Sequence, residues 1–572
     1  MSQYLEEPCS QSGLKSTMPM ACSSRLEEVR LIEAYWPHAD AGGSHRQFAA
    51  LNGVSRSRVG YMVRRAQKVE GSELWKQFVE TGYGLFTLHR IVLAALYVIV
   101  LRAGGGIRMV EEFLRLCGLD DVVASSYGTL QRRQKELEEM VIAFSEEQTE
   151  QLSAQMEEKA ITLAEDETFH GGKPCLVAMD VMSNFILLEE YANDRKRETW
   201  TTRIEAATAS MPVRIEQCVT DGARALKSHV EHDLGAHPSP DTFHIQQDLS
   251  KATARALEQR TSVASDALRK AEDALQRVQE QAQRAATEPR KPGRPIDFDK
   301  RIEAASQERD RAQDTLKQAI WDQESARDTR ARISALYHLV DPVTGHSPAP
   351  DQLEAELTSC FDILDAIAER TGLRSSAVKL LAKTRKQIGA MVATFCFAWS
   401  MIRLDLDQLD LAPGLREHVE DQLVAACYLK QITSRAPDAE TRHRLTKRAQ
   451  ELESEFEHNT PGWSALDGAE RQRIKESVQR SVGIFQRSSS CVEGRNGVLA
   501  LNRHAFHCLT KRRLAALTAV HNFAVQRDDG TTAANRFFEL QHPDMFGWLL
   551  SKLPPPARPR KCRDSQPRMN AA

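Results

Sequence analysis

Three acidic residues that lie far apart in the chain are the best candidates for chemistry: Asp166, Asp221 and Glu493. Carboxylates brought together in one groove repel each other unless a cation lies between them, and hard oxygen ligands suit Mg²⁺ or Mn²⁺ better than zinc. Two such ions about 3.5 to 4 Å apart can activate a water or a 3′-hydroxyl and stabilise the leaving oxygen of an in-line phosphoryl displacement. That chemistry requires elements that bring the three residues together.

Short strand-like segments precede or contain two of these residues. Residues 161–170 form an apolar segment that ends in acid around Asp166, and residues 213–220 lead directly to Asp221 and the turn former Gly222. If both acids stand at the carboxyl ends of adjacent strands, they lie side by side. The same patterns predict strands at 175–179, 185–191 and 241–245, and helices at 198–208 and 225–232.

The third ligand is expected from a helix beside the sheet, at 490–496.

Each of the candidate site residues also has a simpler interpretation. Asp166 lies in a Glu-Asp-Glu cluster that could be an exposed strand end, and Asp221 could be a turn former. Glu493 follows Ser490 by three residues, as in a capping box. For His244, a core histidine and a role near the active site are equally good interpretations.

In this order the motifs resemble the DDE transposases of bacterial insertion sequences. The resemblance rests on Asp-Glu-Thr-Phe-His-Gly-Gly-Lys-Pro from Asp166, on 219–222, on Asp241-x-x-His244, and on 489–496 with 521–523 and 529–532. It covers residues from about 160 to 250 and from about 480 to 540. One departure is that the lysine some subfamilies place after the glutamate has no clear counterpart, because Ala500 lies in that region.

The resemblance implies a mainly α chain with an α/β RNase H-like catalytic core built on a mixed five-stranded sheet. It implies two Mg²⁺ (or Mn²⁺) ions held by Asp166, Asp221 and Glu493, with His244 as a further catalytic residue. The expected activity is cleavage of DNA at element ends and transfer of the 3′-hydroxyl ends to target DNA, by a homodimer or higher oligomer. The alternatives are a structure-specific nuclease or resolvase of the same fold, and a non-catalytic DNA-binding regulator.

The first 70 residues follow a helix-turn-helix pattern. A helix at 25–36 precedes residues 45–59, in which Gly53 makes the turn and Ser55 can cap the second helix. That helix would present basic side chains to a major groove. They are Arg56, Arg58, Arg64, Arg65 and Lys68. The alternative is an ordinary helical hairpin with a solvated basic face.

The chain turns basic after Glu493, which indicates contacts with a DNA backbone. The residues predicted to bind DNA there are Arg495, Lys511, Arg512 and Arg513. A solvated basic face is the alternative.

The long stretch between Asp221 and Glu493 is predicted to be a helical insertion. Apolar residues keep a seven-residue period from Leu268 to Ala282 and again from Ala305 to Ile333, which indicates two coiled-coil arms. The connecting turn contains Pro-Gly-Arg-Pro at 292–295, which looks like an AT-hook or is simply a basic loop tip.

The composition of the chain argues against several classes of protein and of site. The net charge of −3 gives no global signal for nucleic acid, and the eleven cysteines form no Cys-x-x-Cys pair, which argues against a zinc site or a disulfide framework. The longest apolar run, 91–101, is short for a membrane span and indicates a buried helix. We therefore expect a cytoplasmic, nucleoid-associated protein without membrane contact.

The predicted domains follow from these segments. They are a disordered N-terminus (1–23), the helix-turn-helix (24–70), a helical segment and second candidate DNA-binding module (71–155), the first part of the core (156–250), the coiled-coil hairpin (251–340), the helical insertion (341–480), the last part of the core with the glutamate helix (481–540), and a basic disordered tail (541–572).

Overall fold

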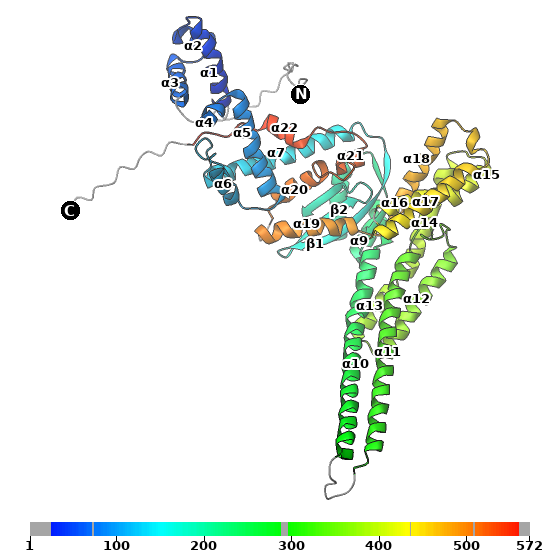
Figure 1. Ribbon diagram of the computed structural model, residues 1–572. Coiled ribbons are helices and arrows are strands. Elements are labelled where there is room, and N and C mark those ends of the chain that lie inside the picture. Colours follow the sequence, from blue (N-terminus) through cyan, green and yellow to red (C-terminus); the bar gives the residue numbers. More distant parts are fainter. Residues whose placement is uncertain are drawn as a thin grey trace. The chain divides into compact units, whose positions relative to one another are not determined.

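Figure 1 shows the computed structural model, which describes residues 24–70, 74–287, 296–434, 436, 438–506 and 509–559. The chain divides into two compact units. The terminal unit comprises the residues up to 152, 499–535 and those from 539 onward, and the sheet unit comprises 153–498 and 536–538. Most described residues are helical and the described strands form one mixed five-stranded sheet, which confirms the prediction of a mainly α chain with a small α/β core.

The sheet has the strand order β3-β2-β1-β4-β5. Its strands are β1 (Lys159–His170), β2 (Lys173–Asp180), β3 (Ile186–Tyr191), β4 (Val213–Thr220) and β5 (His237–Pro240). The central strand β1 pairs antiparallel with β2 and parallel with β4, and β5 pairs parallel with β4. β1 and β4 are therefore neighbours, as the placement of Asp166 beside Asp221 requires.

Helices cover both faces of the sheet. Asp166 is opposite Val177 and Val177 is opposite Glu189, so these side chains share one face, which carries α19 (Ser490–Phe506). Glu165 is turned to the other face because neighbouring strand residues alternate. There Glu165 lies 3.7 Å from His229 of α9 (Arg224–His229), which continues as the π-helix η2 (Val230–Leu234). Glu167, on the same face, accepts the indole N–H of Trp200 on α8 (Arg197–Thr208) at 3.4 Å.

The predicted strand at 241–245 is wrong. β5 ends at Pro240, and α10 (Thr242–Thr287) begins two residues later. β5 was not predicted because it contains two prolines, which lack a backbone N–H. An edge strand tolerates them, because the N–H groups on its outer side form no hydrogen bonds to a neighbouring strand. The Asp241 carboxylate accepts the Phe243 N–H at 2.8 Å, as an N-cap does, and this bond starts the helix instead.

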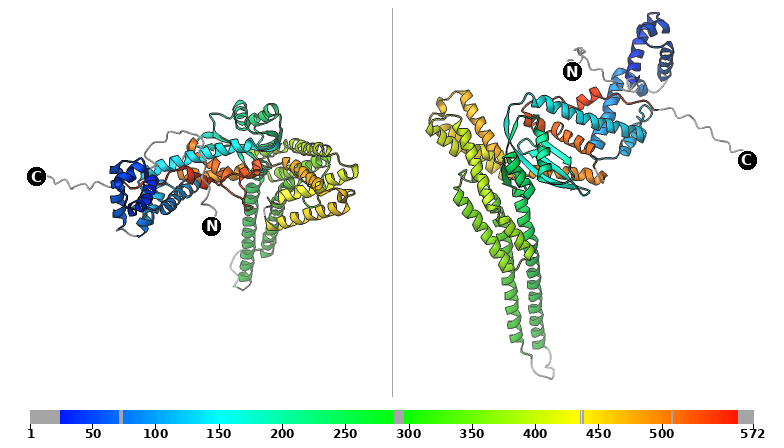
Figure 2. Two further views of the ribbon diagram at one scale, coloured as in Figure 1. Left: turned by 90° about the horizontal axis from the view of Figure 1, so that it is seen from above. Right: turned by 180° about the vertical axis from the view of Figure 1, so that it is seen from behind.

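The insertion is helical, as predicted, and begins with two long arms. α10 and α11 (Phe298–Leu336) lie side by side in Figures 1 and 2, with Leu257, Ala264, Ala319 and Ala326 buried along them. The Pro-Gly-Arg-Pro turn lies outside the described residues. The remaining helices are α12 (Pro350–Thr371), α13 (Ser375–Arg385), α14 (Ile388–Asp407), α15 (Pro413–His418), η3 (Val419–Leu423), α16 (Val424–Thr433), α17 (Ala439–Asn459), η4 (Trp463–Ala465) and α18 (Gly468–Ile484). They share one apolar core with the base of α10.

The regular elements described in the terminal unit are helices, and they include the second half of α19. Its other helices are α1 (Ser24–Asp40), α2 (His45–Leu51), α3 (Arg56–Glu70), α4 (Leu74–Phe78), α5 (Gly82–Ala95), η1 (Leu96–Arg102), α6 (Ile107–Leu116), α7 (Tyr127–Ser153), α20 (Lys511–Phe523), the start of α21 (Ala533–Phe538) and α22 (Met545–Lys552). α1, α2 and α3 pack around Tyr35, Phe48 and Val59, and Gly53 has the positive φ of 64° that the turn between α2 and α3 requires.

Two helical stretches are long and apolar enough to cross a membrane by length and composition alone, Gly82–Arg102 and Ser375–Asp407. Core helices pass the same test, and 61% of the first stretch's most apolar window is buried within the structure.

The predicted disorder after residue 540 is wrong for the described residues. Met545–Lys552 form α22, and the extended segment beyond it is held by polar contacts within the terminal unit. The Arg558 guanidinium pairs with Glu80 and Glu28, and Arg25 donates to the Pro556 carbonyl at 3.1 Å. The proline-rich composition suggested disorder. The residues that hold this segment lie more than 470 positions away along the chain, so the local sequence does not reveal them.

Candidate metal centre

Three side chains of the sheet unit converge on one point: Asp166, His244 and Glu493. One ligand atom of each lies within 4.8 Å of the ligand atoms of the other two. Asp166 comes from β1, His244 from the first turn of α10 and Glu493 from the first turn of α19. Two carboxylates and an imidazole at this spacing are suited to hold a divalent cation.

Asp166 is the buried member of the cluster. Only 9% of its surface is exposed, and its Oδ1 atom accepts the Glu167 N–H at 2.8 Å. The pKa of Asp166 is raised to about 6, mainly by burial; the negative charges of Glu493 and Asp221 contribute to the rise, while the Glu167 N–H and His244 oppose it. A buried carboxylate beside other acids gains most from a cation that neutralises them.

The prediction that Asp166 stands at the carboxyl end of its strand is wrong. β1 continues to His170, paired with β2, whereas its parallel ladder with β4 ends at the pair Ala164 and Val219. Asp166 therefore lies just past the end of that ladder, where β1 and β4 part. The candidate site therefore opens where the two strands part and not at the end of β1.

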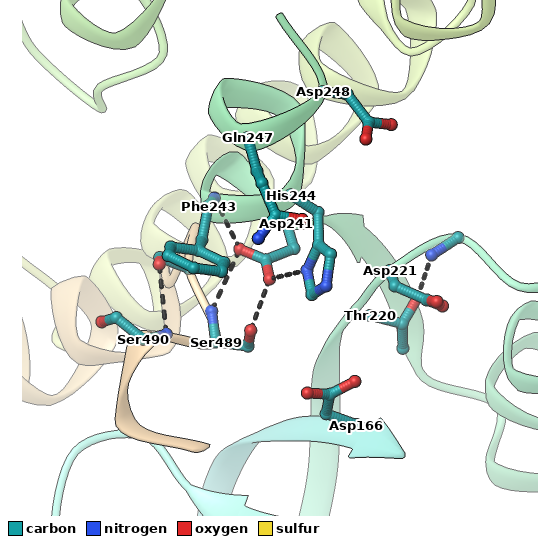
Figure 3. Close-up of polar contacts among 12 residues, drawn as sticks. Asp166, Thr220, Asp221, Asp241, Phe243, His244, Gln247, Asp248, Ser489 and Ser490 are labelled. Carbon is teal, nitrogen blue, oxygen red and sulfur yellow. Dashed lines mark hydrogen bonds and ion pairs between the residues drawn. The ribbon is translucent and has the colours of Figure 1, made fainter. Parts of the chain in front are cut away.

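Asp241 orients His244, as Figure 3 shows. The Nδ1 atom of His244 lies 2.7 Å from Oδ2 of Asp241, and this hydrogen bond raises the pKa of His244 above its usual value. Because Nδ1 is engaged, Nε2 is the nitrogen left to face a ligand. Histidine ligands of metal ions are commonly held this way, by a carboxylate on the far ring nitrogen.

The same carboxylate joins the starts of the two helices that carry the ligands. Asp241 is 2% exposed and accepts the Ser489 N–H at 3.1 Å, together with the Ser489 hydroxyl. The backbone N–H of Thr242 donates to the Arg487 carbonyl at 2.8 Å. These bonds tie the first turn of α10 to the residues that lead into α19, so His244 and Glu493 are positioned as a pair.

Arg495 fixes α19 against the sheet. Its guanidinium binds both carboxylate oxygens of Glu189 on β3, at 2.8 and 2.5 Å, and both side chains are buried. The prediction that Arg495 binds DNA is therefore wrong, since the side chain has no surface to offer. Sequence reasoning missed its partner because Glu189 lies 306 residues away.

Asp221 lies near the cluster but outside the group of three. It follows β4 and is exposed, and its Oδ1 atom accepts the Ala223 N–H at 2.8 Å in a turn that includes Gly222. Its charge acts on both Asp166 and His244, which places it in their surroundings. The structure thus brings His244, rather than Asp221, into direct reach of the other two ligands.

The predicted DNA-binding side chains divide into exposed and engaged ones. On α3, Arg56 and Arg64 are exposed and Arg65 is partly buried, while Arg58 pairs with Glu27 at 3.0 Å. Beyond Glu493, Lys511 is exposed.

The next two arginines are bound to one carboxylate in the terminal unit. Arg512 and Arg513 pair with the buried Glu138 at 2.8 and 2.7 Å, and Arg513 itself is 7% exposed. The prediction that Arg513 contacts DNA is wrong for the same reason as for Arg495: a buried cation satisfied by a carboxylate stabilises the fold.

Comparison with known proteins gives one partial match. Residues 419–565 match the model of a family of unknown function (DUF6399). The search of curated proteins found no match, and neither did the search of solved structures. The matched residues include Glu493 but neither Asp166 nor His244.

Proposed function

We propose that this chain is a metal-dependent DNA transposase with an RNase H-like catalytic core, as the motifs around Asp166, Asp221 and Glu493 suggest. The observation that carries the proposal is the convergence of Asp166, His244 and Glu493 within 4.8 Å. Asp166 and His244 meet Glu493, which lies more than 240 positions further along the chain, where two parallel strands part. A DNA-binding regulator does not require such a cluster, whereas metal-dependent DNA chemistry does.

The donor set fits a hard divalent cation. Two carboxylates supply charge, His244 supplies one neutral nitrogen, and the raised pKa of Asp166 reflects acids held together in a buried place. Mg²⁺ and Mn²⁺ suit carboxylates, and Mn²⁺ also accepts imidazole. Asp221, whose charge acts on Asp166, would be the residue to hold a second ion.

The residues of the chain have separate tasks in the proposed reaction. A bound divalent ion supplies an activated water or 3′-hydroxyl and a polarised phosphate oxygen. Asp166 and Glu493 hold the charge that retains it. Asp241 keeps Nε2 of His244 turned toward the cluster, and Arg495 keeps α19 and its glutamate on the sheet. No covalent link between protein and DNA is required.

The three N-terminal helices would supply recognition of the element ends in a helix-turn-helix manner. α3 exposes Ser57, Tyr61, Arg64 and Lys68 along one stripe, at spacings of four, three and four residues. These residues lie on one face of a helix, and the face carries no acid. That stripe suits a helix entering a major groove, with cations for the flanking phosphates.

The test is cleavage and strand transfer on a labelled duplex that carries the inverted repeats flanking the coding region. With Mg²⁺, the wild type should cut the repeat end and join it to target DNA, and Asp166→Asn should bind the duplex but do neither. Asp248→Asn, which changes an acid on α10 that pairs with Lys383, is the matched control. Cutting without joining would indicate a nuclease or resolvase, and binding without metal-dependent products would indicate a regulator.

A further inference from the structure

The terminal unit contains an open groove of about 710 Å³ between α6, α7 and the start of α20. It is separate from α3 and from the metal centre, since all its lining residues lie at 100–138 and 509–513. The sequence patterns marked α6 and α7 as a second candidate DNA-binding module, and no role has been assigned to them so far.

Three helix N-termini contribute to the wall of this groove. The residues at these N-termini that line the groove are Gly106 of α6, Gly128 of α7 and Thr510 of α20. Helix N-termini carry partial positive charge and unpaired N–H groups, which favour anions. Among the described residues no side chain caps α6, and a Cβ placed on Gly106 or Gly128 would meet nothing within 4 Å. Their backbone is therefore open to a ligand.

The charge of the described lining residues is strongly positive. Arg132, Lys135, Arg512 and Arg513 face a single acid, Glu138, which the two later arginines already neutralise. Arg132 and Lys135 are exposed and form no ion pair with another described residue. Two cations on one helix face thus remain available to a partner.

A buried polar group also opens onto the groove. Gln134 is 5% exposed and donates from Nε2 to Glu138 at 3.3 Å, while its Oε1 atom has no hydrogen-bond partner among the described residues. A buried oxygen without a partner costs free energy unless a ligand or water satisfies it. A water bound there can donate its second hydrogen to a phosphate oxygen.

We propose that this groove binds the phosphodiester backbone of double-stranded DNA, as a contact additional to α3. The partner follows from the combination of the N-termini of α6 and α7, two available cations and an exposed Tyr127 along a groove much larger than one phosphate. The inference rests on the proposed function in that DNA is the polyanion this chain handles.

The first test uses the full chain and a labelled duplex of arbitrary sequence, without divalent metal. Affinity is measured by fluorescence anisotropy over a series of salt concentrations. In Arg132→Gln/Lys135→Gln the slope of log affinity against log salt should fall by about two, one for each lost phosphate contact. Arg90→Gln, an exposed arginine of α5 outside the groove, should leave the slope unchanged.

The second test adds a charge without disturbing the fold. Gly106 has φ −76° and ψ 155°, which any residue adopts, and both Asp and Ser are good N-caps there. Gly106→Asp and Gly106→Ser should therefore melt at or above the temperature of the wild type. Only Gly106→Asp should weaken DNA binding, because it places a carboxylate where the phosphate would lie.

Unchanged salt slopes together with equal binding by the two Gly106 variants would overturn the proposal. So would full competition by millimolar inorganic phosphate, which would indicate a small-anion site. Neither result bears on the metal centre, because the assay contains no metal and measures no cleavage. Conversely, if the protein proves to have no strand-transfer activity, the salt dependence of DNA binding at this groove is still measured and interpreted in the same way.

Discussion

Asp241 and His244 form one polar unit, in which Nδ1 of the imidazole lies 2.7 Å from a carboxylate oxygen that also accepts the Ser489 hydroxyl. The other oxygen of Asp241 accepts the N–H groups of Phe243 and Ser489. A single buried carboxylate therefore sets the direction of one ligand and the start of the helix that carries another. In this way Asp241 positions two residues of the candidate metal centre.

Removing the charge of Asp241 should weaken metal binding. In Asp241→Asn the imidazole loses its charged partner, and loss of such a partner typically lowers metal affinity by about 10- to 100-fold. Titration of Mn²⁺ followed by electron paramagnetic resonance measures the affinity directly. Asp248→Asn on the same helix should bind Mn²⁺ as the wild type does. Equal affinities in both variants would mean that Asp241 only caps α10.

The buried pair of Arg495 and Glu189 should contribute to stability and not to DNA affinity. Arg495→Ala leaves Glu189 buried without its partner, so the free energy of unfolding should fall by about 3 to 5 kcal/mol. The double variant Arg495→Met/Glu189→Leu should recover much of that loss. Urea denaturation measures both. A variant that unfolds like the wild type yet loses DNA affinity would restore Arg495 as a DNA contact.

The exposed cations of α3 should contribute directly to DNA binding. Arg64→Gln/Lys68→Gln should lower the affinity for duplex DNA and reduce the salt slope by about two, because each cation replaces condensed counterions at a phosphate. Arg30→Gln, on the exposed face of α1, is the control. If the control and the α3 variant lose affinity equally, α3 has no special role and the three helices present a general basic surface.

Acid should destabilise the sheet unit through His338. This residue is 8% exposed, bonded to the Tyr428 hydroxyl at 2.6 Å, and its pKa is lowered well below the usual value by burial and further by Arg487. Its folded pKa lies below the unfolded value near 6.5, so stability is full above that pH and is lost as the pH falls below it.

The pH effect is best measured as a difference between variants. Burial raises the pKa values of Asp166 and Asp180, so their protonation increases the stability of the fold as the pH falls, opposite to the effect of His338. This contribution is the same in every variant. Urea denaturation between pH 8 and 5 should show a smaller loss for His338→Gln than for the wild type. The exposed His443→Gln should behave as the wild type. An equal pH dependence in all three proteins would exclude His338 as the cause.

Local patterns predicted the elements of the sheet well but not its edge. The ranges 161–170 and 213–220 were found because apolar alternation and a terminal acid or glycine mark such strands. β5 was missed because its two prolines argue against a strand, and only its place at the edge of the sheet permits them. Residues 241–245 alternate like a strand, but the Asp241 side chain captures the backbone and starts a helix.

The candidate site was predicted in its residues more than in its geometry. Asp166, His244 and Glu493 were all singled out, yet Asp221 was placed in the cluster ahead of His244. Which of these residues reach the cluster depends on where β1 and β4 separate, and no local sequence pattern reveals that point. The burial of Arg495 and Arg513 was equally hidden, because each depends on a carboxylate more than 300 residues away.

The most direct measurement replaces Asp166 with a sulfur ligand and asks whether the metal preference of DNA chemistry changes. Asp166→Cys should lose cleavage of the repeat-end duplex in Mg²⁺, which binds thiolates poorly, and should regain part of it in Mn²⁺. Such a rescue would show that residue 166 holds the ion that cuts DNA. Cleavage in Mg²⁺ at the rate of the wild type would contradict a catalytic metal at Asp166, and with it the proposed function.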